Sequence, residues 1–252
     1  MGSRKSPSSC LLIDHGNSRI KWALTDAGDL SVGQAIDYHD EQTDFSPWEK
    51  LNTVQRVLVS NSAGPKAFAY LSDRCQNQWQ LNPELLEAQP EQCGVINSYP
   101  EPQTLGADRW LALIAARQIF KNSLAVIDCG TAVTCDALSK EGVFLGGVIS
   151  AGPKVAADAL VKKAAHLDLD EMHYPGAFNT DTASAVSAGS LIFTVGGIEK
   201  VLNEFRSKLG DEIRVLMTGG WAATLAPLMN LDAEVYPDLV LQGIQFVAGK
   251  ES

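Results

Sequence analysis

The sequence predicts an α/β protein built from two similar halves, and three observations support this. Hydrophobic residues make up 45% of the chain, enough for a globular core. A strand, a glycine turn and a second strand are expected twice, at Leu11-Leu-Ile-Asp14-His-Gly16-Asn17-Ser18 and at Ala125-Val-Ile-Asp128-Cys-Gly130-Thr131. In each half, helices and a further strand follow these hairpins, so the order of elements recurs loosely.

The first half, residues 10–120, follows a disordered lead at residues 1–9. Its strands are expected at Cys10–Asp14, Arg19–Thr25 and Val54–Ser60, where short apolar runs end at polar or glycine-containing turns. A helix is expected from Pro65 to about Gln76, and another from Trp110 to Phe120. Residues 30–55 and 79–91 give no clear pattern.

The second half, residues 121–252, opens with the hairpin around Gly130. A strand and glycine-rich loop at Phe144–Pro153 lead to a helix at 154–167 and a loop at 168–181. Ala183–Leu209 predicts one long helix or two broken ones. Strands at Arg214–Thr218 and Ala233–Tyr236 each precede a helix.

Composition narrows the classes of partner. The formal net charge of −10 argues against nucleic acid as an obligatory partner, because phosphate backbones attract basic surfaces. The five cysteines form no CxxC pair and have no metal-type spacing with the four histidines, which favours a reducing compartment. No apolar run suggests a signal peptide or a membrane span. We expect a soluble, cytoplasmic protein without a membrane partner.

The two hairpin tips carry the groups that a phosphate site needs. Glycine lets the backbone approach closely, and a nearby hydroxyl can donate a hydrogen bond. Near the first tip, Lys21 would neutralise phosphate charge and Asp14 would hold a hydrated metal. Each hairpin alone could be an ordinary turn, but their recurrence, with Gly146-Gly147 and Thr218-Gly219-Gly220, favours a nucleotide held between two halves. His15 either contacts a phosphate or is an exposed bystander.

A second cluster precedes the helix expected at Trp110. Asp108 and Arg109 lie at or near its N-terminus, where Asp108 either caps the helix or accepts a proton from a substrate hydroxyl. Tyr99 lies in the proline-containing loop just before Gly106 and is suited to line one side of a small pocket.

Together these motifs resemble the type III pantothenate kinases of the acetate and sugar kinase/Hsp70/actin superfamily, in the same order along most of the chain. Asp14–Lys21 resembles the first phosphate motif, Gly106–Arg109 the pantothenate motif, Asp128–Asp136 the second phosphate motif, and Thr218–Gly220 the adenosine-side turn. The resemblance implies duplicated ribonuclease H-like (actin-like ATPase) domains with mixed β-sheets and the nucleotide in the interdomain cleft. It also implies ATP-dependent phosphorylation of pantothenate to 4'-phosphopantothenate, the first step of coenzyme A biosynthesis.

The resemblance further implies residue roles. Asp108 would accept the proton, and Asp128 would ligate a monovalent cation, K+ or NH4+. Mg2+ would accompany ATP, and the protein would form a homodimer. Substrate would contact Tyr99, Gly106, Ala107, Asp108, Arg109 and Thr182, and ATP would contact Asp14, His15, Gly16, Asn17, Ser18, Arg19, Ile20, Lys21 and Thr131.

The choice of Thr182 rests on an (Asn/Asp)-Thr-x-x-Ala-x-x-x-Gly pattern. Asn179-Thr180 matches its start but not its downstream spacing, whereas Asp181-Thr182-Ala-Ser-Ala185-Val-Ser-Ala-Gly189 fits throughout. Two positions depart from the family, namely Ser18 in place of threonine and Ala151 in place of proline. Alternative functions are a kinase for another small hydroxylated acceptor and a non-enzymatic, transcription-linked accessory protein on the same scaffold.

Overall fold

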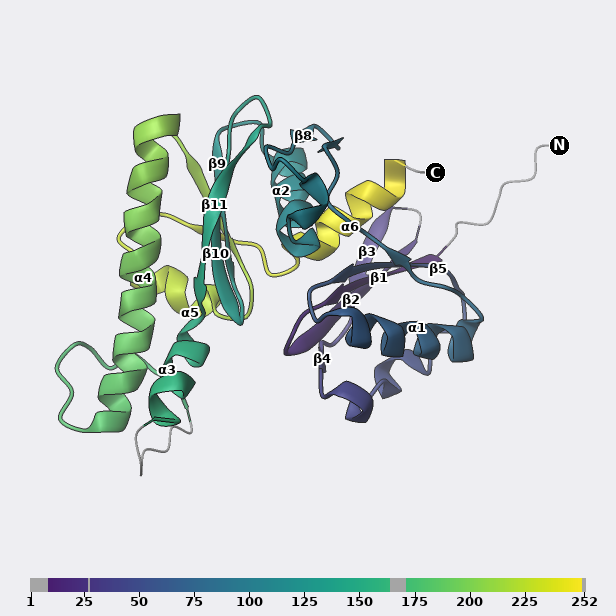
Figure 1. Cartoon of the computed structure of the whole chain (residues 1–252), viewed down its shortest axis with the longest axis horizontal. Coiled ribbons are helices and arrows are strands. Elements are labelled where there is room, and N and C mark those ends of the chain that lie inside the picture. Colours follow the sequence, from purple (N-terminus) through teal and green to yellow (C-terminus); the bar gives the residue numbers. More distant parts are fainter. Residues whose placement is uncertain (1–8, 27, 164–170, 251–252) are drawn as a thin grey trace. The chain divides into compact units, whose positions relative to one another are not determined.

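The computed structural model describes residues 9–26, 28–163 and 171–250, which divide into two compact units (Figure 1). Unit 1 comprises Met1–Phe120 together with Asp238–Ser252, and unit 2 comprises Lys121–Pro237. The C-terminal segment therefore groups with the first unit, whereas the sequence analysis assigns it to the second half. Of the predicted lead, residues 1–8 lie outside the described residues, and Ser9 begins the first strand.

Unit 1 is built on a mixed sheet with the strand order β3-β2-β1-β5-β6, in which β4 also pairs with β2. Strand β1 is antiparallel to β2 and parallel to β5, so the predicted first hairpin is present. The strands are β1 (Ser9–His15), β2 (Arg19–Asp26), β3 (Asp29–Val32), β4 (Ile36–Asp37), β5 (Val54–Asn61) and β6 (Glu84–Leu85).

Helices cover both faces of this sheet. Helix α1 (Pro65–Trp79) buries Leu71 and Cys75 against Leu11 and Ile13 of β1. On the other face, α6 (Leu239–Lys250) packs against β1 and also against α2 (Ala107–Ile119) (Figure 1). Helix α2 begins at Ala107 rather than at Trp110, because the chain becomes helical directly after the glycine at position 106.

The segments that the sequence left unassigned form short elements. Between β4 and β5 lie two 3-10 helices, Asp40–Gln42 and Ser46–Trp48, and they bring Trp48 into the core, where it is fully buried. Farther along, β7 (Glu91–Gln92) and β8 (Val95–Ile96) make a small antiparallel ribbon, and a 3-10 helix at Pro102–Thr104 precedes α2.

Unit 2 repeats the arrangement of unit 1. Its sheet has the order β11-β10-β9-β12-β13, with β10 antiparallel to both β9 and β11, and β12 parallel to β9 and β13. The strands are β9 (Leu124–Cys129), β10 (Ala132–Leu138), β11 (Phe144–Ala151), β12 (Arg214–Thr218) and β13 (Glu234–Val235). Hairpin, crossover and parallel strand thus recur in the same order, which confirms the predicted duplication.

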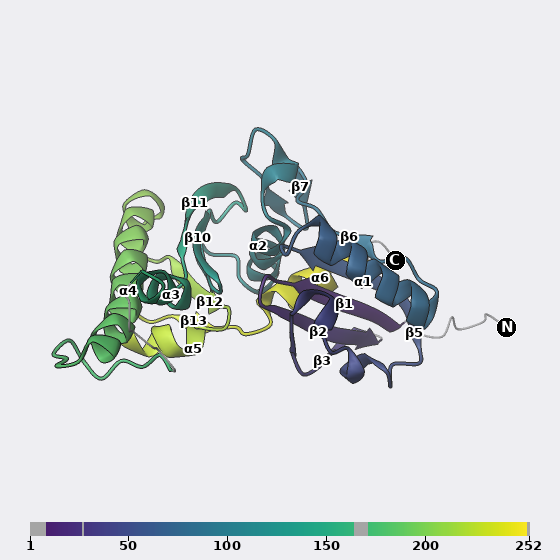
Figure 2. The ribbon, with the colours of Figure 1, turned by 60° about the horizontal axis from the view of Figure 1, so that its bottom comes forward.

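The helices of unit 2 are α3 (Pro153–Val161), α4 (Thr182–Leu209) and α5 (Ala222–Leu225), followed by a 3-10 turn at Ala226–Leu228. Helix α4 runs along the sheet beside α3 (Figures 1 and 2). It is one continuous helix, which settles the alternative left open by the sequence. The end of the helix predicted at 154–167 reaches residues outside the described ones.

Helix α4 corrects the expectation that no segment reaches membrane-spanning length. By length and composition alone it is long and apolar enough to cross a membrane. One face of the helix nevertheless lies in the core of unit 2, where Leu191, Val195 and Leu202 pack against the sheet. Because that buried stripe follows helical spacing, its apolar content is also explained by packing on the sheet.

Candidate active site

The first predicted phosphate turn joins β1 to β2 in unit 1. The Gly16 amide donates a hydrogen bond to the Arg19 carbonyl at 3.0 Å, which closes the turn. Asn17 and Ser18 are exposed at its tip. This tip is therefore open to solvent at the position where the sequence predicts a phosphate contact.

Beside this turn, Asp14 is half-buried on β1. It faces Lys21 on β2 and Ser60 on β5, so these three side chains project from the same face of the sheet. Carboxylate and hydroxyl oxygens are ligands that suit Mg2+, which keeps several waters of its own. The donor set at Asp14 thus fits a hydrated divalent ion.

The His15 side chain corrects the sequence analysis, which allows it to be exposed or to face phosphate. It is fully buried, because β1 continues through residue 15 and alternation turns its side chain toward the core that Ile13 also faces. Burial lowers the pKa of His15 to about 4, so the imidazole is neutral at neutral pH. Ile20 is also fully buried. Only the backbone of these two residues is available to a ligand.

The second predicted phosphate turn joins β9 to β10 in unit 2. The Gly130 amide donates to the Ala132 carbonyl at 2.9 Å, and Thr131 is exposed at the tip. Gly152 packs against this tip, since its amide donates to the Thr131 carbonyl at 2.8 Å and an added Cβ would lie 2.4 Å from the Gly130 carbonyl oxygen. Only glycine fits there, so the loop after β11 supports the turn.

Asp128 lies at the end of β9 and contacts the glycine turn that follows β12. Thr218 is its neighbour in the parallel pair, and Gly219 has a φ of +89°. A Cβ on Gly219 would lie 2.3 Å from Asp128 Oδ1 and 2.6 Å from the Cys129 carbonyl oxygen, so both oxygens surround this turn. Carboxylate and carbonyl oxygens are the donors that suit an alkali cation. The residues present therefore fit a monovalent cation at Asp128.

The residues predicted to contact pantothenate come together at the start of α2 in unit 1. Gly106 is the N-cap and Asp108 lies in the first turn, so Asp108 is not the capping residue. The half-buried Asp108 carboxylate accepts a hydrogen bond from the Arg109 amide at 2.7 Å through Oδ1. The buried Arg109 side chain donates from Nη1 to the Tyr99 hydroxyl at 3.2 Å. Half-buried Ala107 is the first residue of the helix.

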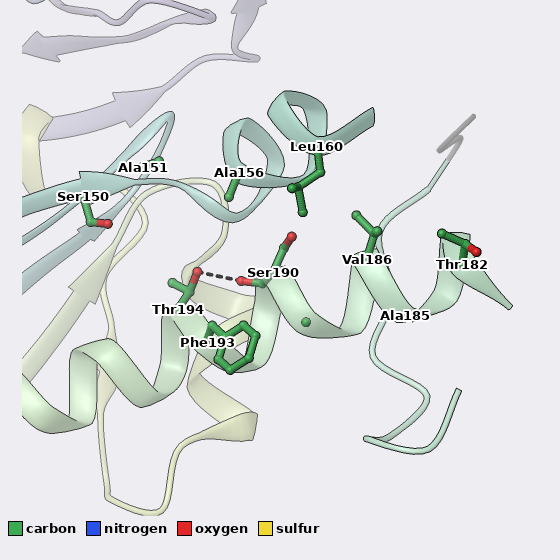
Figure 3. Close-up of a pocket in the computed structure, with 11 residues that line it drawn as sticks. Ser150, Ala151, Ala156, Leu160, Thr182, Ala185, Val186, Ser190, Phe193 and Thr194 are labelled. Carbon is green, nitrogen blue, oxygen red and sulfur yellow. Dashed lines mark hydrogen bonds between the residues drawn. The ribbon is translucent and has the colours of Figure 1, made fainter. Parts of the chain in front are cut away.

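Thr182 begins α4 in unit 2 and lines a pocket of about 450 Å³ between α3, α4 and the end of β11 (Figure 3). Asp181 is the N-cap and accepts from the Ser184 amide at 2.8 Å, a bond that lowers the pKa of Asp181. Leu160 and Val186 project into the pocket (Figure 3). Thr180, the alternative in the sequence analysis, does not line it.

Sequence reasoning missed the polar residues at the end of β5. Ser60 is fully buried, and its hydroxyl has no hydrogen-bond partner among the described residues. Asn61 follows it and is the β5 neighbour of His15. Because β1 and β5 are parallel, their carboxyl ends meet at one edge of the sheet. Two polar residues, Ser60 and Asn61, directly after an apolar run could have indicated this position from the sequence.

Comparison with known proteins places this arrangement in a family. Residues 10–204 match the family model described as type III pantothenate kinase. The chain belongs to the type III pantothenate kinase family. A type III pantothenate kinase from Nitrosococcus oceani is 36% identical over 94% of this chain and 93% of its own length, and one from Nitrosospira multiformis is 35% identical over 96% and 92%.

Solved structures show the fold of this type III pantothenate kinase family member. A conserved Baf family transcriptional activator from Campylobacter jejuni aligns with a TM-score of 0.59 at 22% identity, over 96% of this chain and 98% of its own. MreB5 of Spiroplasma citri bound to ADP aligns with a TM-score of 0.53 at 8% identity, over 98% and 97%. At these identities the likeness concerns the fold alone, and it confirms the predicted actin-like architecture.

The family match also bears on the predicted motifs. It contains Asp14–Lys21, Gly106–Arg109 and Asp128–Asp136, whereas the turn at Thr218–Gly220 lies beyond it. That turn is nevertheless tied to the second motif within unit 2, because Gly219 packs against Asp128. In this type III pantothenate kinase family member, the motifs thus occupy strand ends and the first turn of a helix, as the sequence predicts.

Proposed function

We propose that this protein transfers the γ-phosphoryl group of ATP to the primary hydroxyl of pantothenate, giving 4'-phosphopantothenate for coenzyme A biosynthesis. The observation that carries the proposal is membership of the type III pantothenate kinase family across most of the chain. The ordered motifs support it, since two glycine hairpins recur in two sheets of the same topology.

Asp108 is the proposed proton acceptor. Arg109 fixes one of its oxygens, and Oδ2 has no hydrogen bond from the described residues, so it can face a substrate hydroxyl. In phosphoryl transfer the transition state is loose, and positioning matters more than strong basicity. The buried Arg109 guanidinium, held by Tyr99, would pair with the pantothenate carboxylate.

We propose ATP contacts at each of the two phosphate turns. Lys21 and the tip at Gly16–Ser18 would meet phosphate oxygens from unit 1, and Thr131 would do so from unit 2. Asp14 would hold hydrated Mg2+, and Asp128 would hold K+ or NH4+. These ions, when bound, would supply positive charge that offsets the phosphate charge.

We further propose a cytoplasmic homodimer. Unit 2 exposes large apolar side chains on β11, α3 and α4, among them Phe193, which is 81% exposed, and Ile149, which is 63% exposed. Such exposure is typical of a surface that another chain covers, and the resemblance to a dimeric family makes a second copy the expected occupant. The five cysteines are free and buried, as expected in a reducing compartment.

The test is an ADP-release assay with ATP, Mg2+ and pantothenate, with and without K+, on the wild type and on Asp108→Asn. Asparagine keeps an oxygen for the Arg109 amide but loses basicity, so we expect kcat to fall by about 10²-fold or more. Asp73→Asn, an exposed substitution in the same unit, is the control and should retain activity.

Two outcomes would contradict the proposal. If the wild-type protein releases no ADP in response to pantothenate, the proposed reaction is wrong. Undiminished turnover in Asp108→Asn would keep the reaction but transfer the role of proton acceptor to another group.

A further inference from the structure

A short strap, defined as residues Ile36–Asp40, lies along the first phosphate turn. Its strand β4 pairs with the start of β2, where Ile36 faces Ile20 and Asp37 faces Arg19. Arg19 and Asp37 also form an exposed ion pair at 3.1 Å. The strap therefore follows the second arm of the hairpin, directly after the turn.

Tyr38 in this strap contacts both arms of the hairpin. Its amide donates a hydrogen bond to the Ser18 carbonyl at 3.0 Å, on the side where the turn ends. Its ring packs edge-on against the imidazole of His15, with the ring centroids 4.6 Å apart and the planes at 87°. His15 is the last residue of β1, where the turn begins. One residue thus bridges the turn that contains Gly16.

The Tyr38 ring is a defined contact of the His15 imidazole, which no hydrogen bond from the described residues holds in place. Neither of its nitrogens has a hydrogen-bond partner among the described residues, although the side chain is fully buried. The His15 carbonyl accepts from the Ser62 amide at 2.9 Å, so the backbone is held by the chain after β5. The ring of Tyr38 supplies the specific contact on the side-chain end.

We propose that Tyr38 is a positioning residue that fixes the turn Gly16–Ser18 in the conformation that receives the phosphates of ATP. This inference rests on the proposed function and deepens it at the nucleotide side. A phosphate site acts through groups whose directions are set before the ligand arrives, so a loosened turn binds ATP less tightly. Among the described residues, the hydrogen bonds and ring contact of Tyr38 go to Ser18, Asp40 and His15, and none goes to Asp108 or Arg109 at the start of α2.

The test compares two substitutions that both keep the backbone amide. Tyr38→Ala removes the ring, and we expect the KM and Kd for ATP to rise about 3–10-fold, as the loss of one aromatic contact implies. Tyr38→Phe keeps the ring and loses only the hydroxyl, which donates to Asp40 at 2.9 Å, so it should behave as the wild type. The KM for pantothenate should stay unchanged in both.

Trp79→Ala is the matched control. Trp79 is also half-buried in unit 1 and packs on Trp48 with the ring centroids 5.9 Å apart, but it belongs to α1 and has no hydrogen bond or ring contact with Tyr38, His15 or Ser18 in the described structure. It should leave the ATP constants unchanged. Thermal unfolding and circular dichroism would establish that each variant is folded, and Tyr38→Leu would replace Tyr38→Ala if alanine prevented folding.

The ATP Kd is measured by calorimetry without pantothenate, which separates this inference from the proposed reaction. Wild type that binds ATP but does not respond to pantothenate contradicts the function, while the comparison of Kd values still tests Tyr38. The inference is overturned if Tyr38→Ala binds ATP as tightly as the wild type, if it raises both KM values equally, or if Tyr38→Phe is as impaired as Tyr38→Ala.

Discussion

At the scale of single residues, the proposed cation site depends on a backbone approach that only glycine allows. Gly219 has a positive φ and lies where any Cβ would press on the Asp128 carboxylate and the Cys129 carbonyl. Gly220, the next residue, has no heavy atom within 4 Å of an added Cβ. Gly219 is thus required by close packing and Gly220 is not, and alanine at each position in turn tests this difference.

We expect Gly219→Ala to lower the free energy of unfolding by about 1–3 kcal/mol, because alanine is strained at this φ. We also expect the displaced Asp128 carboxylate to raise the K+ concentration needed for half-maximal activity. Gly220→Ala should change neither quantity appreciably. Urea unfolding and K+ titration of the ADP-release rate give the two measurements. Equal behaviour of the two variants would show that Asp128 does not depend on the glycine turn.

At the scale of elements, the sequence predicted well those elements that a short stretch of residues specifies. The hairpins around Gly16 and Gly130 were predictable because an apolar run, an acidic residue and a glycine lie within a few positions. The strap around Tyr38 was not, since β4 is only two residues long and is specified by pairing with β2. The burial of His15 was also missed, because a turn motif does not reveal how far the strand continues.

Helix α4 presents two faces with different consequences. Leu191 and Val195 lie in the core of unit 2, whereas Phe193, between them in sequence, is 81% exposed. We expect Phe193→Asp to convert the proposed dimer to a monomer in analytical ultracentrifugation, because a charge in a covered apolar surface is unfavourable. Since the side chain is exposed within one chain, the substitution should not unfold the monomer.

The control on the same helix is Asn203→Asp, which adds a charge at another exposed position. It should leave the oligomeric state unchanged. A dimer that persists in Phe193→Asp at the same protein concentration would show that the second copy does not cover this residue. A wild type that is monomeric throughout would remove the dimer from the proposal.

At the scale of the whole molecule, the assignment of the C-terminal helix is the feature that sequence order concealed. Helix α6 follows unit 2 in the chain but packs on β1 and α2 of unit 1. Its apolar pattern predicts a buried helix and carries no information about which sheet it covers. That choice is set by tertiary packing, so unit 2 of the structure covers Lys121–Pro237, whereas the second half expected from the sequence runs from residue 121 to residue 252.

A paired glycine substitution in α6 tests this assignment. A Cβ on Gly243 would lie 2.1 Å from the carbonyl oxygen of Leu111 in α2, so the two helix backbones touch there. We expect Gly243→Ala to destabilise the protein by about 1–3 kcal/mol, because the helices must separate. Gly249→Ala, with open space around its Cβ, should be neutral or stabilise by up to about 1 kcal/mol through helix propensity.

Hydrogen exchange shows where the destabilisation falls. If α6 belongs to unit 1, amides of β1 and α2 should lose protection in Gly243→Ala, while those of β9 and β12 in unit 2 keep it. Loss of protection confined to β9 and β12 would contradict the assignment. Because Asp108 and Arg109, which we propose to contact pantothenate, lie in the first turn of α2, the variant should also raise the KM for pantothenate, whereas Gly249→Ala should not.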